Sequence, residues 1–152
     1  MRRLDMSRLA SKRAGVKPGR IGATVLEMAI AAPVVLLLLI GMFEMGISVY
    51  AYNTLAEAVR AGARYAAVHG AKAATPCGPT ANNTNVENVV RGYAPGIVAT
   101  DLTVTSTWPD GNNSTGSHVT VAATYTYRFA ATKLLGMQTL KLSSTSTTVI
   151  NH

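Results

Sequence analysis

The sequence is poor in the residues on which most catalytic and metal sites depend. It has one cysteine, Cys77, together with three histidines and seven acidic residues in a chain of 152 residues. A single cysteine excludes an internal disulfide framework and a multi-cysteine metal site. Its thiol has two interpretations, a bond to a partner chain or a free thiol that the fold tolerates, and we favour the second.

No motif in the sequence indicates catalysis. The histidines His69, His118 and His152 are scattered, and neither a phosphate-binding loop nor a His-Glu-x-x-His pattern is present. Residues 110–114 resemble the start of a calcium loop but lack its later glutamate. We therefore predict no catalytic residue, no metal site and no cofactor, and a membrane-tethered enzyme is the least favoured class.

The positive charge of the chain is concentrated in its first 20 residues. They hold seven of the 14 lysines and arginines and one acid, Asp5, so they carry +6 of the total charge of +7. A basic protein can bind nucleic acid, but here the basic block directly precedes an apolar run. Because the orientation of a membrane segment explains that arrangement better, we predict no nucleic-acid partner.

A long apolar run follows the basic block. Residues 21–43 include one ionisable side chain, Glu27. As a helix they would span about 34 Å, enough for a hydrocarbon core of about 30 Å. Backbone polar groups in lipid must be satisfied within the segment, so a helix is expected despite Pro33. The sequence thus predicts one membrane-spanning helix, and the lipid bilayer is its first partner.

The charge on either side of this helix predicts its orientation. Seven basic residues precede it, whereas Arg60 is the one basic residue among the twenty that follow Phe43. The positive-inside rule therefore places the N-terminus in the cytoplasm and the C-terminal domain across the membrane. The alternative is a cleaved secretory signal peptide, whose apolar region has about 7–15 residues. The longer run and the lack of a small-residue cut site after it disfavour that alternative.

Glu27 lies within the first turns of the apolar helix. A carboxylate in hydrocarbon is costly and indicates a functional contact, although an interfacial position that reaches water is the alternative. Gly22, five residues earlier, gives a spacing that resembles the processing site of type IV prepilin-like proteins, where a membrane peptidase cuts after the glycine. The cut would free the α-amino group of Ala23, a cation for the Glu27 carboxylate of a neighbouring helix. We therefore predict a processing site at Gly22 and Ala23 and an assembly contact at Glu27.

Helical periodicity continues over residues 44–69. Small and apolar residues recur every three or four positions, at Leu55, Ala58/Val59, Gly62 and Tyr65/Ala66. The stripe predicts a helical stalk that packs on the chain's own domain. An intermolecular coiled coil is the alternative, and the absence of leucine heptads disfavours it. Arg60 and Arg64 lie four residues apart on one side of this helix, as possible partner contacts or as a solvated face.

Residues 70–152 predict a small domain. A turn-rich segment and a short helix over residues 86–93 come first. Three alternating or β-branched runs then predict strands over residues 102–108, 119–127 and 140–150. They would form a roughly three-stranded antiparallel sheet covered by the two helices, because an isolated sheet of this size is marginal. The expected fold class is α+β, with the long helix first.

The N-terminal region resembles a known family. Residues 22–44 begin with Gly22 and Glu27, continue through a proline and a leucine run, and end at Glu44; they are similar to the signature of TadE-like (TadE/TadF type) pilus-assembly proteins. Residues 58–66, Ala-Val-Arg-Ala-Gly-Ala-Arg-Tyr-Ala, are also similar to that family, and the strand at 119–127 with the later Leu-Leu-Gly is in keeping with it. Met28 stands where an aromatic residue is common.

The resemblance implies a minor pseudopilin of a type IV-like tight-adherence (Tad/Flp) pilus. Glu44, Arg60 and Arg64 are possible partner contacts of such a protein. It implies a single-pass protein of the bacterial inner membrane with a periplasmic C-terminal domain. Its partners would be a prepilin peptidase, other pseudopilins, the major pilin helices and the inner-membrane assembly platform. The implied organisation is a removed leader (1–22), a transmembrane helix (23–43), a helical stalk (44–69) and an outer domain (70–152). A membrane-anchored binding or scaffold module without a filament role is the alternative.

Overall fold

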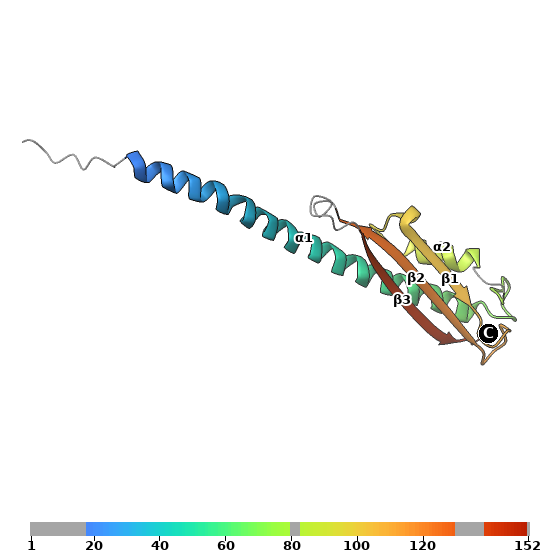
Figure 1. Cartoon of the computed structure of the whole chain (residues 1–152). Coiled ribbons are helices and arrows are strands. Elements are labelled where there is room, and N and C mark those ends of the chain that lie inside the picture. Colours follow the sequence, from blue (N-terminus) through green and yellow to red (C-terminus); the bar gives the residue numbers. More distant parts are fainter. Residues whose placement is uncertain (1–17, 80–82, 130–138, 152) are drawn as a thin grey trace, which may run out of the picture. The chain divides into compact units, whose positions relative to one another are not determined.

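The computed structural model describes residues 18–79, 83–129 and 139–151. Its elements are the helices α1 (Pro18–Val68) and α2 (Thr84–Gly92), the short 3-10 helix η2 (Ala99–Asp101), and the strands β1 (Leu102–Thr107), β2 (His118–Arg128) and β3 (Thr139–Val149) (Figure 1). The α+β class, with a long N-terminal helix before a three-stranded antiparallel sheet, is confirmed. Most of the basic leader, the Leu-Leu-Gly at 134–136 and His152 lie outside the described residues.

The chain divides into two compact units, Met1–Leu39 and Ile40–His152. The described part of the first unit is helical throughout, and α1 continues through Pro33. Its apolar side chains are exposed, from Val25 at 62% to Leu38 at 60%. Exposure of so much apolar surface to water is unfavourable, so we expect lipid or neighbouring helices to surround this segment. In the described part of the chain this is the one helix long and apolar enough to cross a membrane, which indicates single-pass anchoring.

The second unit contains the sheet, in the order β1-β2-β3 with both neighbours antiparallel. Strand β1 alternates strictly between buried and exposed residues. Its buried positions Leu102, Val104 and Ser106 face the same side as Val121 and Ala123 of β2, with which β1 is in register. One face of β1 and β2 is therefore mostly apolar, because successive side chains of a strand point to opposite faces.

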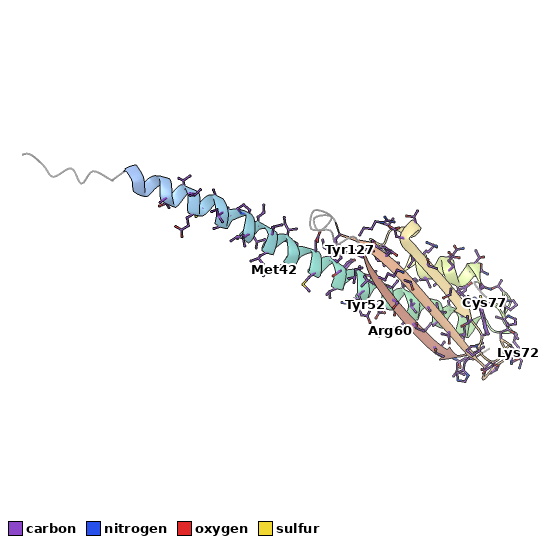
Figure 2. The ribbon with its side chains drawn as sticks, viewed as in Figure 1. Met42, Tyr52, Arg60, Lys72, Cys77 and Tyr127 are labelled. Carbon is purple, nitrogen blue, oxygen red and sulfur yellow. The ribbon has the colours of Figure 1, made fainter. Side chains whose placement is uncertain are left out.

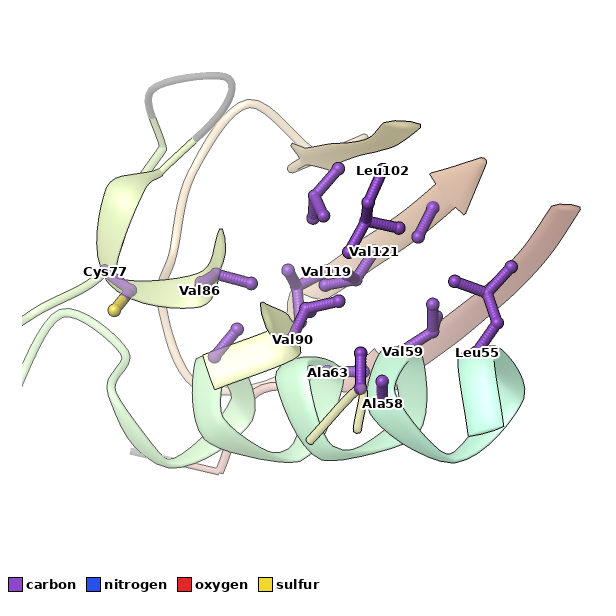
Figure 3. Close-up of a cluster of buried hydrophobic side chains, with 14 of the residues drawn as sticks. Leu55, Ala58, Val59, Ala63, Cys77, Val86, Val90, Leu102, Val119 and Val121 are labelled. Carbon is purple, nitrogen blue, oxygen red and sulfur yellow. The ribbon is translucent and has the colours of Figure 1, made fainter. Parts of the chain in front are cut away.

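The core lies between that face and the two helices (Figure 3). The stripe predicted on the helix packs on the chain's own sheet, as the spacing favoured, so the coiled-coil alternative is not needed to bury it. Fully buried side chains come from both helices and the sheet: Leu55, Ala58 and Val59 on α1, Val86 and Val90 on α2, and Val119 and Val121 on β2. The second half of α1 thus belongs to the same compact unit as the sheet.

Gly62 permits α1 and α2 to lie close together. A Cβ atom at this position would be 2.5 Å from Cγ2 of Val90 and 3.6 Å from side-chain atoms of Val86 and Val121. Real Cβ atoms essentially never approach other heavy atoms within 3.0 Å. Val90 is β-branched and fully buried, so it has little freedom to move aside. The α1–α2 contact therefore requires a residue without a side chain.

Cys77 is buried beside this core. Its backbone N–H donates to the carbonyl of His69 (2.7 Å), and the side-chain amide of Asn113 donates to its carbonyl oxygen (3.2 Å). Burial raises the pKa of the Cys77 thiol. A bond to a partner chain would require this segment to open, so the structure favours the free-thiol interpretation.

We expect Cys77 to resist a maleimide reagent in the folded chain. The thiolate is the reactive form, and both burial and the raised pKa reduce its availability. Labelling followed by intact mass should be roughly 100-fold slower in buffer than in denaturant, because it requires local opening. A Cys77→Ser chain carrying Thr145→Cys on the exposed side of β3 is the control and should label rapidly. Equal rates for the two thiols would show that the Cys77 segment is open.

Candidate functional site

The predicted processing site lies near the start of α1. The helix begins at Pro18, a residue suited to a first turn because its φ is helical and its missing N–H would lack a partner there. A Cβ atom at Gly22 would meet no atom within 4 Å, and Ala23 is exposed. A peptidase would have to unwind this turn to reach the peptide bond. Glycine eases the unwinding, since in a helix it is about 1 kcal/mol less favourable than alanine.

Glu27 lies one helical turn after Ala23 on the same side of α1, since residues four apart are neighbours in a helix. Its side chain is exposed, and it forms no ion pair within the described residues. The adjacent Leu26 and Met28 are 65% and 62% exposed and apolar. The carboxylate is therefore set in an apolar surface, where a positive group of another chain can reach it.

Glu44 has a different environment from Glu27. It belongs to the second unit and is only 6% exposed. Burial raises the pKa of Tyr127, and the negative charges of Glu44 and Tyr125 raise it further. Tyr127 is therefore close enough to Glu44 for the two groups to interact electrostatically. Glu44 thus lies within the chain's own fold. Its part in partner contacts stays a prediction.

Aromatic side chains lie at the end of the apolar run on α1 and just after it. Phe43 is 75% exposed, and Tyr50 and Tyr52 follow at 59% and 46%. Tyrosine, which has an apolar ring and a polar hydroxyl group, is enriched where a membrane meets water. Their position supports an end of the spanning segment close to residue 43.

Arg60 and Arg64 both lie on α1 beside β3 (Figure 2 labels Arg60). The guanidinium of Arg60 donates to Oε1 of Glu57 at 2.7 Å, and both side chains are more than 60% exposed. Arg64 is exposed and forms no ion pair with any residue that the structure describes. A groove of about 430 Å³ separates the two elements and is lined by Glu57, Arg60, Ala63, Arg64, Ser146, Thr147 and Thr148.

The sequence did not indicate that β3 lies beside these arginines. The sequence contains one indication that β3 differs from the other strands. In residues 143–148, both alternating sets of side chains are polar. That pattern is typical of a strand without a fully buried face. The pattern does not indicate which helix lies beside β3.

The polar clusters of the outer domain do not form a catalytic constellation. Nδ1 of His118 lies 2.8 Å from Oδ2 of Asp110, and both side chains are about half exposed. The hydrogen bonds from the His118 side chain and backbone hold the pKa of Asp110 below its usual value. Oγ of the adjacent Ser117 donates to Asn112 rather than to His118. No group of three metal-ligating side chains occurs among the residues described.

The family model for TadE-like protein matches residues 22–64 of the chain. This segment of the chain is TadE-like. The TadE-like segment begins at Gly22 and includes Glu27, Glu44, Arg60 and Arg64, so it covers every predicted site residue, and it ends four residues before α1 does. The resemblance inferred from the sequence is confirmed, and the match indicates a protein associated with a Tad pilus. No curated protein and no solved structure matches the chain significantly.

Proposed function

We propose that this chain is a minor pseudopilin of a type IV-like tight-adherence pilus and acts in pilus assembly or initiation. The observation that carries the proposal is the TadE-like match, which begins at the glycine predicted as the cut site and continues along the apolar helix. In this proposal the chain is a structural component and not an enzyme. It resides in the inner membrane, with its N-terminus in the cytoplasm and its outer domain in the periplasm.

Each part of the chain has a role in this proposal. The basic leader, residues 1–22, orients the helix and is then removed by a prepilin peptidase. Residues 23–43 span the bilayer, where the α-amino group of Ala23 from one chain donates a hydrogen bond to the Glu27 carboxylate of a neighbour. Residues 44–69 and 70–152 form the stalk and outer domain, which contact other pseudopilins, the major pilin and the assembly platform. The apolar, uncovered surface of the first unit and the exposed Glu27 support these roles.

Intact mass of the membrane-extracted protein tests the processing step. In a host with the matching prepilin peptidase we expect the chain to lose residues 1–22 and to begin at Ala23. A Gly22→Leu variant should keep its leader, because a large side chain prevents close approach to the backbone. Gly46→Leu, on the same helix and also in open space, is the matched control and should be cut normally. A wild-type chain that keeps Met1, or that is cut near residue 50, would contradict the proposal.

The second candidate is a membrane-anchored binding or scaffold module of the envelope. It is favoured by the outer domain, which has its own core and its own polar groove. The two candidate functions predict different phenotypes for a strain in which the gene is deleted. Loss of pili together with genes for a secretion ATPase and a prepilin peptidase nearby would support the pseudopilin, whereas normal pili would support the module.

A further inference from the structure

Strand β3 has one edge with no strand beside it. All eleven of its residues pair with β2, and the described residues include no strand on its other side. The N–H of Ile150, just after β3, donates to the carbonyl of Ser117 next to β2 at 2.8 Å. Because the backbone groups of successive residues point to opposite edges, those of Ser143, Thr145 and Thr147 face the free edge.

Apart from Lys141 near its start, β3 lacks the features that usually protect an edge strand. Residues 142–149 contain neither a charged residue nor proline, and the register with β2 runs without a bulge. Natural proteins commonly place such features on an exposed edge because its unpaired N–H and C=O groups are a template for another strand. Side chains of Ser143, Thr145 and Thr147 are exposed and small, so they would not obstruct an added strand.

The helix-facing side of β3 is polar, unlike that of β2. Ser144, Ser146 and Thr148 are half-buried and stand opposite Ala123, Val121 and Val119. The apolar core therefore ends at β2, and the groove between β3 and α1 is lined by hydroxyl groups and by Arg60 and Arg64. Since Arg60 is held by Glu57, the free positive charge at this groove belongs to Arg64.

The charges argue against a second copy as the occupant. Four acids of the described outer domain already have a basic partner: Glu57 with Arg60, Glu87 with Arg91, Asp101 with Arg128, and Asp110 with His118. Glu44 is buried. A second copy thus has no spare carboxylate in this domain for Arg64, so the groove suits an acidic segment of a different protein.

We propose that the free edge of β3 binds an extended segment of a different protein, which adds as a fourth strand and brings a carboxylate to Arg64. Main-chain hydrogen bonds to Ser143, Thr145 and Thr147 supply the binding, and the arginine supplies the preference for an acidic side chain. The inference names a class of partner for the proposed assembly protein, but binding at this edge requires neither a filament nor processing.

Binding of model peptides to the full chain in lipid nanodiscs tests the proposal. The probe is the end-blocked, labelled peptide Thr-Val-Thr-Glu-Thr-Val-Thr, compared with a peptide that has Lys in place of Glu. Fluorescence anisotropy should show the Glu peptide binding about tenfold more tightly than the Lys peptide, and Arg64→Glu should reverse this order. Lys72→Glu makes the same charge change away from the groove and should leave the order unchanged. Hydrogen exchange should slow in peptides of β3 that contain Ser143–Thr147.

Thr145→Pro and Thr145→Ala form a matched pair for the backbone contact. Proline removes an N–H that faces the free edge and breaks no bond to β2, so the domain should fold while binding weakens by about tenfold. Alanine retains the N–H and should bind within about twofold of wild type. Equal binding by both variants would overturn the proposal, and so would no binding of the Glu peptide. A wild-type chain that dimerises in detergent, and whose dimer dissociates on Thr145→Pro, would also overturn it, in favour of a second copy. Loss of leader cleavage with intact peptide binding would instead contradict only the proposed function.

Discussion

Replacing Gly62 with leucine is expected to destabilise the outer domain by about 3 kcal/mol or more. Even the first added carbon would lie 2.5 Å from Cγ2 of Val90, and the remaining atoms would enter a region already filled by Val86 and Val121. Leucine is a better helix former than glycine by nearly 1 kcal/mol, so helix propensity alone would stabilise the variant. The expected loss of stability therefore arises from overpacking, which outweighs that gain. For a domain of this size, a loss of that magnitude is a large part of the total stability.

The single tryptophan offers a direct measurement of this loss. Trp108 belongs to the core and is 7% exposed, so its fluorescence reports unfolding of the outer domain without interference from the membrane helix. Gly46→Leu is the control, since a Cβ there meets no atom within 4 Å, and its urea midpoint should remain near that of wild type. A midpoint for Gly62→Leu equal to that of Gly46→Leu would show that the helices do not lie as close as described.

A double-mutant cycle isolates the contact itself. Val90→Ala removes the atom that a Cβ at Gly62 would meet, at the usual cost of losing buried methyl groups. Gly62→Ala should therefore be less destabilising in the Val90→Ala background than in the wild-type background. Coupling of about 1 kcal/mol is expected for residues in direct contact. Additive effects would show that the destabilisation by Gly62→Ala does not arise from contact with Val90.

Glu27→Gln is expected to leave the chain inserted in the membrane and folded, yet to reduce the number of assembled pili by about tenfold or more. Glutamine fits the apolar helix at least as easily as glutamate, so insertion is not impaired. It carries no charge for the α-amino group of Ala23 from a neighbouring chain. In an apolar environment the unpaired cation is costly, which is the reason for the large expected effect.

Three measurements separate these effects. Alkaline extraction reports insertion, Trp108 fluorescence reports folding, and electron microscopy of the native host reports piliation. Glu87→Gln is the matched control, because it makes the same chemical change in the outer domain, away from the groove, and removes one ion pair with Arg91 that contributes about 1 kcal/mol. Normal piliation by the Glu27→Gln strain would rule out an essential ion pair between helices at this position.

Local sequence signals were sufficient for the elements of this fold. The long apolar run and the alternation of residues 102–107 each depend on neighbours within a few positions, so α1 and β1 were predicted close to their observed bounds. The spacing of the stripe at Leu55 and Val59 also indicated a face that packs on the sheet. The TadE-like match covers the same N-terminal region in which the sequence placed Gly22 and Glu27.

The sequence by itself therefore determined the membrane helix, the α+β order of elements and the TadE-like segment, because composition, periodicity and short spacings carry that information. Only the tertiary structure decided that Gly62 lets α1 approach Val90 closely and that Cys77 is enclosed. It alone also decided that Arg64 lies beside β3 with no ion pair among the described residues. These features are distances between residues that are far apart along the chain. No local pattern encodes such a distance, because it is set by how helices and strands pack after they have formed.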